Sequence, residues 1–411
     1  MREFSIIISF FTVCCLVGAG TANAQDEVFS ISQNLDLKNL SPVIATNRAT
    51  GDIVVAWTQK DDKTDSRAIY SCYCKYLGAG KFKAGKPRLV SEKKGHNETP
   101  SIAFDPSSKS YLLAWSRFER FGATSKANNI IARKISSTGR LKGKAVYITD
   151  STSGHSKQPL ILSRSSATGA TAASSGYMII FVHYPIYSTE IERGLNTITV
   201  DGKGRITGEP QNVFNPVTMS GKTGRIWLYD AKKDDAGNVI LPFVAIYSDD
   251  TADTWLAKID STGKGSKTLK LAGERLRGPG ITVLSSKLYL FTWTEQYEAD
   301  FYHQLVKANL KKKKKPFTSA GEFAYYQPVG LELDGGGAYI IAADKYNFDI
   351  RKFNARGKLV GSRETKTLSI YVLSMSDCAL LPDGKCLVVM HRSVGSDYEN
   401  YEVFGFTLDL E

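Results

Sequence analysis

A pair of short apolar segments separated by a turn recurs along the chain and limits the folds open to it. In the clearest copies a Pro-containing segment precedes a segment that ends in Trp: Ser41–Ala45 with Asp52–Trp57, and Thr99–Phe104 with Tyr111–Trp115. Weaker copies are Gln158–Leu162 with Tyr177–Val182, Arg225–Leu228 with Val239–Ile246, Gly278–Ile281 with Leu288–Trp293, Gln327–Leu331 with Tyr339–Ala343, and Cys378–Leu381 with Leu387–Met390. Such runs are typical of β-strands, and their regular return indicates a repeat fold.

A third strand, a Gly turn and a short fourth strand follow most of these pairs. Ile131–Ile135 leads into the turn at Gly139, and Leu256–Ile259 leads into the turn at Gly263. Val146–Thr149 is typical of the short fourth strand. Four short strands per repeat, joined by Gly, Asp and Asn turns, predict an all-β chain folded as a β-propeller.

The two ends of the chain complement each other. The seventh unit ends at Glu411 after its third strand, Tyr401–Leu408, whereas Glu27–Ser32 supplies a spare strand before the first unit. Pairing the two would leave no long open sheet edge. The sequence therefore predicts a seven-bladed β-propeller whose ring is closed by the N-terminal strand joining the last blade. Six or eight blades, an open array and a sandwich are the alternatives.

The N-terminus has the pattern of an export signal. Arg2 precedes an apolar run, Ile6–Val17, and Thr21–Ala24 ends in an A-x-A sequence. This pattern predicts a signal peptide over residues 1–24, cleaved after Ala24, and a single domain over residues 25–411. The apolar run is too short for a spanning helix, and no later segment reaches 18 apolar residues, so we expect no transmembrane segment. The expected location is secreted or periplasmic.

Four cysteines follow the predicted cleavage point. Cys72 and Cys74 alternate on one face of a strand, and Cys378 and Cys386 flank a turn. An exported chain can oxidise its thiols, but pairing requires a specific geometry. Two alternatives therefore remain: a disulfide between Cys378 and Cys386, or unpaired thiols in the core.

The units resemble those of secreted bacterial β-propeller repeat proteins, which read P-x-V-A-x-x-x-x-x-G-x-x-L-V-x-W. The units that begin at Ser41 and Thr99 match best. A looser resemblance is to WD-repeat propellers, through Gly95-His96 and Gly154-His155, although the Trp-Asp pair of those proteins is absent. The resemblance implies the fold and export, and it identifies no ligand.

Alternating strand direction sorts the loops into two rims of different charge. The turns between third and fourth strands are rich in Lys and Arg, including the run Lys311, Lys312, Lys313, Lys314 and Lys315. Clustered lysines attract polyanions such as an anionic cell surface or acidic polysaccharide, or they solvate a turn and block edge pairing. This rim has almost no aromatic residues for base stacking, so we expect no specific nucleic-acid partner.

The opposite rim, formed by the loops between second and third strands, combines aromatic and acidic residues. Tyr rings offer flat amphipathic contact area, and carboxylates accept hydrogen bonds from sugar hydroxyls or basic peptides. A glycan or protein ligand is therefore predicted here, and the alternative is that these residues pack between blades. The candidate ligand-binding residues are Tyr184, Tyr187, Tyr247, Asp249, Asp250, Glu295, Tyr297, Tyr302, Tyr346 and Tyr398.

Motifs for catalysis are few. Ser248–Trp255 resembles the Asp-box of sialidase-like propellers, S-x-D-x-G-x-T-W, but has Ala252 in place of Gly and lies between second and third strands. No motif supports the arginine triad that sialidase activity requires. The histidines of the acidic rim (His96, His155, His183 and His391) lack metal-ligand spacing, so no metal or cofactor is expected.

The sequence therefore favours a non-enzymatic binding or scaffold propeller. One alternative is a carbohydrate hydrolase or lyase with carboxylates on the acidic rim. The other is a surface-associated structural protein docked through the basic rim.

Overall fold

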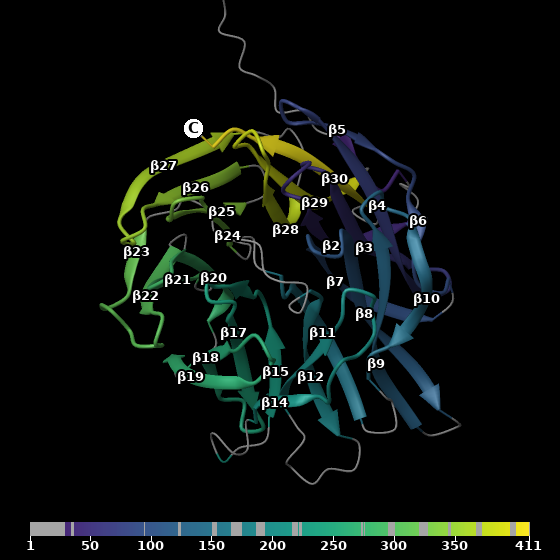
Figure 1. The fold of residues 1–411 in the computed structure, drawn as a ribbon, viewed down its shortest axis with the longest axis horizontal. Helices are drawn as coiled ribbons and strands as arrows, with labels where there is room; N and C mark the ends of the chain where they lie inside the picture. Colours follow the sequence, from purple (N-terminus) through teal and green to yellow (C-terminus); the bar gives the residue numbers. More distant parts are fainter. Residues whose placement is uncertain are drawn as a thin grey trace, which may run out of the picture.

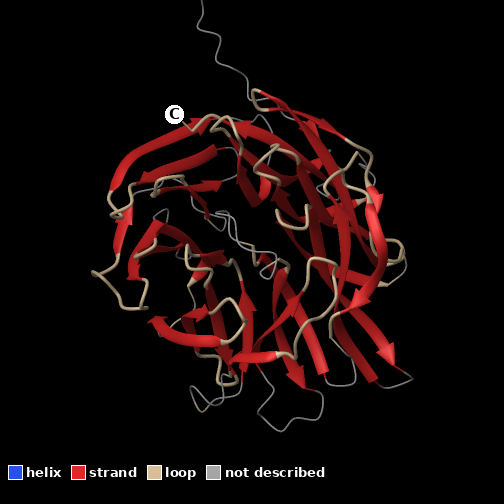
Figure 2. Cartoon of the chain, viewed as in Figure 1, coloured by secondary structure: helices blue, strands red, loops and turns tan. Residues whose placement is uncertain are grey.

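The structure, a computed structural model, describes residues 29–33, 37–93, 95–121, 125–149, 154–165, 175–185, 194–215, 221, 224–272, 274, 276–294, 301–319, 328–343, 347–366, 372–394 and 400–410. These residues form strands, turns and loops (Figure 2). Among them no helix is long and apolar enough to cross a membrane.

The first half of the chain forms antiparallel sheets of consecutive strands. The first unit contains β2 (Lys38–Thr46), β3 (Ile53–Asp61), β4 (Ser66–Gly78), β5 (Lys81–Ala84) and β6 (Arg88–Leu89), with β5 and β6 both paired to β4. The second contains β7 (His96–Asp105), β8 (Ser110–Phe121), β9 (Ser125–Ser136) and β10 (Leu141–Tyr147). The third contains β11 (Gly154–Ser163), β12 (Tyr177–Pro185), β13 (Gly194–Val200) and β14 (Gln211–Phe214).

The second half repeats this order. The next unit contains β15 (Gly224–Leu228), β16 (Lys232–Lys233), β17 (Val239–Tyr247), β18 (Ala252–Ile259) and β19 (Gly265–Ala272). It is followed by β20 (Arg277–Ser285), β21 (Leu288–Thr294), β22 (Phe301–Lys307) and β23 (Phe317–Ser319), and then by β24 (Val329–Glu332), β25 (Ala338–Ala343), β26 (Asn347–Phe353) and β27 (Leu359–Lys366). The last strands are β28 (Val372–Leu380), β29 (Cys386–Val394) and β30 (Asn400–Leu408).

The sheets follow one another around a common centre, so that the purple first unit lies beside the yellow last strands (Figure 1). The chain is an all-β β-propeller. Single parallel pairings join the first unit to its neighbours: Lys38 of β2 pairs with Tyr401 of β30, and Arg67 of β4 pairs with His96 of β7. The short β1 (Phe29–Ser30) pairs antiparallel with β30, with Phe29 opposite Gly405.

The repeated proline marks a β-bulge in the first strand of a unit. The residue before it has a positive φ in three copies, at Ser41 (50°), Thr99 (52°) and Gln158 (53°). In each copy the pairing with the second strand shifts there by one residue, as between Leu40 and Val43 of β2. A bulge inserts one extra residue and turns nearby side chains to a new direction. The sequence repeat therefore encodes a bend near the start of these strands.

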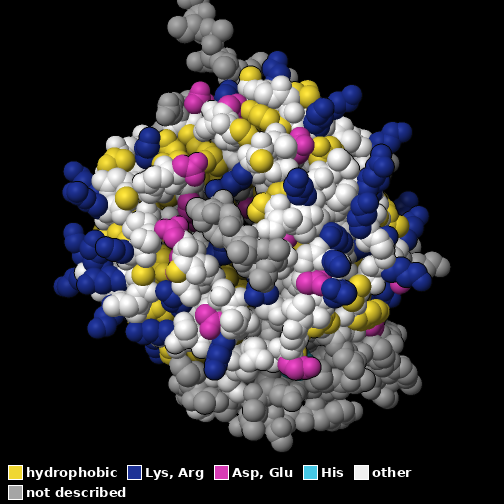
Figure 3. All heavy atoms as spheres, in the orientation of Figure 1, with side chains coloured by type: hydrophobic (Ala, Val, Ile, Leu, Met, Phe, Trp, Pro, Cys, Tyr) yellow, Lys and Arg dark blue, Asp and Glu magenta, His cyan; other side chains and the backbone are white. Residues whose placement is uncertain are grey.

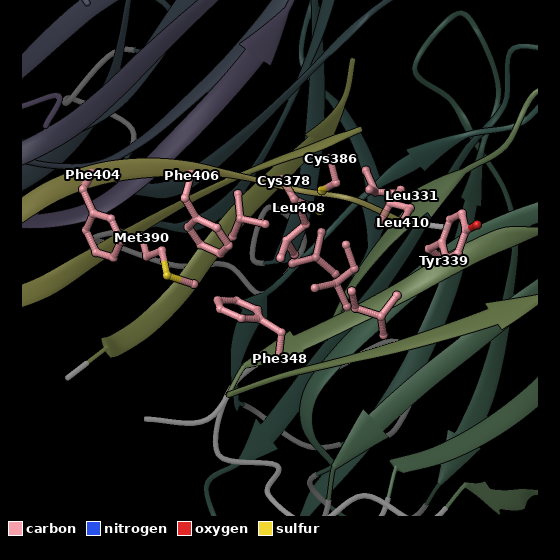
Figure 4. Packing of buried hydrophobic residues seen from close by; sticks show 14 residues of the cluster. Leu331, Tyr339, Phe348, Cys378, Cys386, Met390, Phe404, Phe406, Leu408 and Leu410 are labelled. Atoms are coloured by element: carbon pink, nitrogen blue, oxygen red, sulfur yellow. The ribbon is translucent and has the colours of Figure 1, made fainter. Parts of the chain in front are cut away.

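Buried apolar residues lie between adjacent sheets. One cluster combines Phe348 of β26 with Met390, Phe404 and Phe406 of the last strands (Figure 4). Another combines residues of β3 with Val389 of β29. Because each sheet packs its two faces against two neighbours, the core is divided among the sheet interfaces rather than held in one centre.

The four cysteines of the described chain are buried free thiols. Cys72 and Cys74 lie on the same face of β4, with their Sγ atoms 3.9 Å apart. Cys378 lies opposite Val388 and Cys386 lies opposite Leu380, so the two are not direct cross-strand partners.

Candidate functional site

A pocket of about 480 Å³ opens where β7, β11 and β15 begin and β12 ends. This is the rim that carries the loops between second and third strands. We call it the rim pocket. It is lined by Glu98, Thr99, Ser116, His155, Lys157, Gln158, Val182, Tyr184, Arg225, Ile226 and Trp227.

The bulges described above contribute directly to this pocket. Thr99 and Gln158 are the positive-φ residues before Pro100 and Pro159, and both line the rim pocket. Thr99 Oγ1 donates to Ser116 Oγ at 2.9 Å, and Gln158 N donates to the same oxygen at 3.1 Å. The repeat therefore positions polar groups of two neighbouring units at the same site.

Side chains, rather than close backbone packing, connect β15 to the unit before it. Ile226 N donates to Tyr184 Oη at 2.7 Å, Tyr184 Oη donates to Ile226 O at 3.2 Å, and Leu228 N donates to Gln158 Oε1 at 3.3 Å. By contrast, β24 packs so closely on β20 that a Cβ added to Gly330 would lie 1.7 Å from Thr282 Oγ1. Because side chains bridge β11 and β15, the two strands stand further apart than β20 and β24, and this leaves room for a pocket between them.

The exposed side chains of the rim pocket are aromatic or cationic. Arg225 and Trp227 flank the buried Ile226 on β15, and Trp227 is 39% exposed. Lys157 is exposed as well. The one carboxylate among the lining residues, that of Glu98, forms an ion pair with Arg67. Burial lowers the pKa of His155, and the nearby charge of Lys157 lowers it further.

A second cavity, of about 330 Å³, lies between the inner strands and holds charged side chains. Asp377 accepts hydrogen bonds from Ile44 N (3.1 Å) and Cys378 N (2.9 Å), so it bridges β28 and β2. Glu332 Oε1 accepts a hydrogen bond from Val283 N at 3.4 Å and bridges β24 and β20 in the same way. These carboxylates accept hydrogen bonds from backbone N–H groups at the edges of inner strands.

Lys232 supplies the opposite charge in this central cavity. Burial disfavours its charged form, but the carboxylates of Asp230, Glu332 and Asp377 outweigh burial and raise its pKa. Burial raises the pKa of Asp377 to about 6, against the attraction of Lys232. Asp230 Oδ1 accepts from Ala231 N at 2.7 Å, and its buried Oδ2 has no hydrogen-bond partner among the described residues. The charged side chains of this cavity therefore connect inner strands of different units.

The predicted aromatic and acidic residues occupy different environments. Tyr184 lines the rim pocket. Tyr247 is buried, and its Oη donates to Asp253 Oδ2 at 2.9 Å. Tyr302 is half-buried and stacks on Trp293, with ring centroids 5.5 Å apart. Tyr187, Glu295, Tyr297, Tyr346 and Tyr398 lie outside the described residues.

Asp249 and Asp250 lie in the turn between β17 and β18. Asp249 Oδ1 accepts from Thr251 N at 3.2 Å, and Asp250 has a φ of 60°. Both side chains are exposed, and the contact of Asp249 stabilises the turn. The segment that resembles an Asp-box thus joins the second and third strands of its sheet.

The five lysines Lys311–Lys315 are exposed, and Lys312 contacts β19. Lys312 Nζ donates to Leu271 O at 2.7 Å, and Lys267 Nζ donates to Asn309 O at 2.8 Å. Lys267 is exposed too, so it extends the run across two units. We call Lys267 and Lys311–Lys315 the basic surface. Lys and Arg side chains gather at the left edge in Figure 3, over β22 and β23 of Figure 1.

The buried histidines have structural partners. His303 accepts or donates at both ring nitrogens, to Thr292 Oγ1 (3.1 Å) and Ser319 Oγ (2.7 Å), and burial lowers its pKa to about 3. Burial also lowers the pKa of His391 to about 4. In the part of the chain that the structure describes, no group of three or more His, Cys, Asp or Glu side chains is arranged to hold a metal ion.

Sequence reasoning missed Lys157, Gln158, Arg225 and Trp227 as site residues. Gln158, Arg225 and Trp227 fall in the segments predicted as strands, Gln158–Leu162 and Arg225–Leu228, and strand residues are not expected at a rim. Lys157 comes directly before the first of these segments. The available signal, for Gln158 alone, was its position before a repeated proline, because that position forms the bulge.

No protein-family model matches the sequence, and the search of curated proteins gave no match. A solved structure of a protein of unknown function from Dyadobacter fermentans is similar with a TM-score of 0.51 and 11% identity, covering 94% of this chain and 98% of that one. The leech intramolecular trans-sialidase (TM-score 0.49, 11% identity, 95% of this chain and 71% of that one) and the Dos1 propeller (TM-score 0.47, 10% identity, 92% and 95%) are also similar. At these identities the likeness concerns the fold alone.

Proposed function

We propose that this chain is an exported, non-enzymatic binding propeller that recognises a glycan in the rim pocket. The observation that carries the proposal is the combination of an exposed Trp227 and an oriented Tyr184 in one pocket with polar side chains from two units. Two hydrogen bonds to Ile226 fix the Tyr184 hydroxyl. Rigid aromatic rings suit the flat face of a sugar at low entropy cost, and a few polar groups then set orientation.

The same proposal includes the finer features of the fold and its location. We infer seven blades, with β1 completing the last one. The pairing of Phe29 with Gly405 and the buried position of Ile31 against β30 support this closure. The signal sequence over residues 1–24, which lies outside the described residues, supports export.

The rim pocket favours binding over cleavage. Glycoside hydrolysis generally uses two carboxyl groups across the scissile bond. Among the described lining residues the pocket offers only Glu98, which is paired with Arg67. In the central cavity, Asp377 and Glu332 accept hydrogen bonds from backbone N–H groups of inner strands. The rim pocket itself therefore lacks the second carboxyl group that hydrolysis uses among its described lining residues.

A glycan array tests this function. We expect Trp227→Ala to weaken binding of the selected glycan about tenfold or more, because removal of a central aromatic contact is among the costliest changes in a binding site. Tyr147→Ala is the matched control: Tyr147 is 49% exposed and lies on the outer strand β10. Equal binding by wild type and Trp227→Ala, or no glycan bound by the wild type, would reject the proposal.

A second candidate function is attachment to an anionic surface. The basic surface favours it because two lysine–backbone contacts join Lys267 and the run Lys311–Lys315 into one patch.

A further inference from the structure

We infer that the rim pocket selects a saccharide that carries a carboxylate, such as a hexuronate, and that Arg225 and Lys157 bind this group. The inference rests on the proposed glycan-binding function and adds the chemical class of the ligand. It rests on the hydrogen bonds and ion pairs that the polar groups of the pocket already form within the protein.

Three of the lining residues, Ser116, Gln158 and Tyr184, use their acceptor oxygens within the protein. Ser116 Oγ accepts two hydrogen bonds, from Thr99 Oγ1 and Gln158 N, so its own proton is left to donate. Gln158 Oε1 accepts from Leu228 N, which leaves the NH₂ group of the same amide as a donor. Tyr184 Oη both accepts from and donates to Ile226. At Ser116 and Gln158 a ligand therefore meets donors and has to bring the acceptors.

The charged residues of the pocket also favour an anionic ligand. Glu98, the one carboxylate among the described lining residues, forms its ion pair with Arg67. Lys157 and Arg225 are exposed at the pocket, and the ion pairs found among the described residues involve neither of them. The positive charge of Lys157 also contributes to the lowered pKa of His155, after burial. The pocket therefore has a surplus of positive charge.

The geometry favours a sugar acid over other anions. Arg225 and Trp227 lie two residues apart on the same side of β15, so a ring that contacts Trp227 places its substituents near the guanidinium. A guanidinium binds a carboxylate through two parallel hydrogen bonds. A hexuronate carries both parts, a pyranose ring and a carboxylate, on a rigid frame. An acidic peptide supplies the charge without the ring.

Titration calorimetry with three oligosaccharides of equal length tests the inference on the mature chain. The probes are trigalacturonate, its methyl ester, which keeps the shape and removes the charge, and a neutral trisaccharide. We expect trigalacturonate to bind about tenfold more tightly than its ester, since hydrogen bonds between charged groups are roughly twice as strong as neutral ones. Arg225→Gln and Lys157→Gln each reduce the preference for trigalacturonate over its ester.

Lys203→Gln is the matched control, because Lys203 is an exposed lysine in the turn after β13, at the opposite rim. Equal affinities for the acid and its ester would overturn the carboxylate assignment while the glycan-binding function stands. A sulfated trisaccharide or an acidic peptide that binds more tightly than trigalacturonate would overturn it as well. Absence of binding to every saccharide would overturn both proposals.

Discussion

At the scale of single residues, polar side chains connect adjacent units through their inner strands. Asn97 Oδ1 accepts from Trp115 Nε1 at 3.0 Å within its own sheet, and Asn97 Nδ2 donates to Arg67 O of the preceding unit at 3.1 Å. Asn39 repeats this arrangement where β2 meets β30. A buried amide with both ends satisfied stabilises a single arrangement of the two sheets.

Asp377 also connects two units, through β28 and β2, but because it can ionise, its contribution to stability depends on pH. Burial raises the pKa of Asp377 to about 6 in the folded protein, above its ordinary value of 3.8. Between about pH 4 and pH 6 the folded state therefore binds more protons at this site than the unfolded state. The contribution of Asp377 to stability is fully present below pH 4 and is lost as the pH rises through 6.

We expect Asp377→Asn to remove this dependence. As the pH rises from 4 to 7, the free energy of unfolding of the variant should gain up to about 3 kcal/mol relative to wild type, because one pKa unit corresponds to about 1.4 kcal/mol. Urea unfolding at several pH values measures this difference. Asp334→Asn, at an exposed position of the turn after β24, is the control. A difference between wild type and Asp377→Asn that does not change with pH would contradict the assignment.

At the scale of elements, the short β1 and the residues after it lie along β30, the last strand. Ile31 N and Ser32 N both donate to Val403 O, at 2.9 and 3.1 Å, and Ser32 Oγ accepts from Val403 N at 3.1 Å. Ile31 is fully buried beside these contacts. Phe29 stacks on Phe82 of the first unit, with ring centroids 5.3 Å apart. This segment therefore contacts both the last strand and the first unit.

We expect Ile31→Ala to lower the free energy of unfolding by about 2–4 kcal/mol, the usual cost of truncating a fully buried Ile. Deletion of residues 25–33 should cost more and should promote self-association, because it leaves an edge of β30 without a partner. Thermal unfolding and size-exclusion chromatography measure the two effects. Leu77→Ala, at a side chain that is 58% exposed, should change little. An unchanged melting temperature after the deletion would contradict closure by this segment.

At the scale of the whole molecule, positive charge is concentrated instead of evenly spread. The chain has 53 Lys and Arg against 41 Asp and Glu, a net charge of +12. Part of this excess forms the basic surface, where Lys311–Lys315 and Lys267 are exposed side by side. Grouped like charges repel each other, and an anionic partner relieves that repulsion.

We expect the mature protein to bind a soluble polyanion such as dextran sulfate with an affinity that falls as salt rises. Replacement of Lys311–Lys315 by Ser should weaken binding at low salt and make the plot of log affinity against log salt shallower, since each contacting lysine adds somewhat less than one to the slope. Affinity measurements from 50 to 300 mM salt test this.

The control for the basic surface removes five other exposed lysines, Lys81, Lys83, Lys86, Lys142 and Lys144. It changes the net charge by the same amount. Equal losses in the two variants would show that net charge alone determines binding, and the second candidate function would then be rejected.

Much of the fold was predictable because strand formation depends on local sequence. The paired apolar segments, their turns and the propeller fold follow from alternation and turn residues. The placement of Lys311–Lys315 in an exposed turn was also predictable, since five consecutive lysines cannot be buried. The single-residue bulges were not predicted, although they repeat with the prolines, because a strand pattern does not reveal its pairing register.

The candidate site was only partly predictable. Tyr184 was predicted as part of the loop between a second and a third strand; it lies near the end of β12 and lines the rim pocket. Tyr247 has the same kind of position, yet it is buried against Asp253. Exposure depends on how far each sheet stands from the next one, and that distance is set by contacts between residues far apart in the sequence.

By itself, the sequence determined that this chain forms a β-propeller from repeated short strands, because periodicity and turn chemistry act over a few residues. Only the tertiary structure decided where a ligand would fit. The spacing of β15 from β11 depends on contacts between units, and so do the pairs Glu98–Arg67, Gln158–Leu228 and Ser116–Gln158. Those contacts engage the acceptor oxygens of Ser116 and Gln158 and leave their donors available.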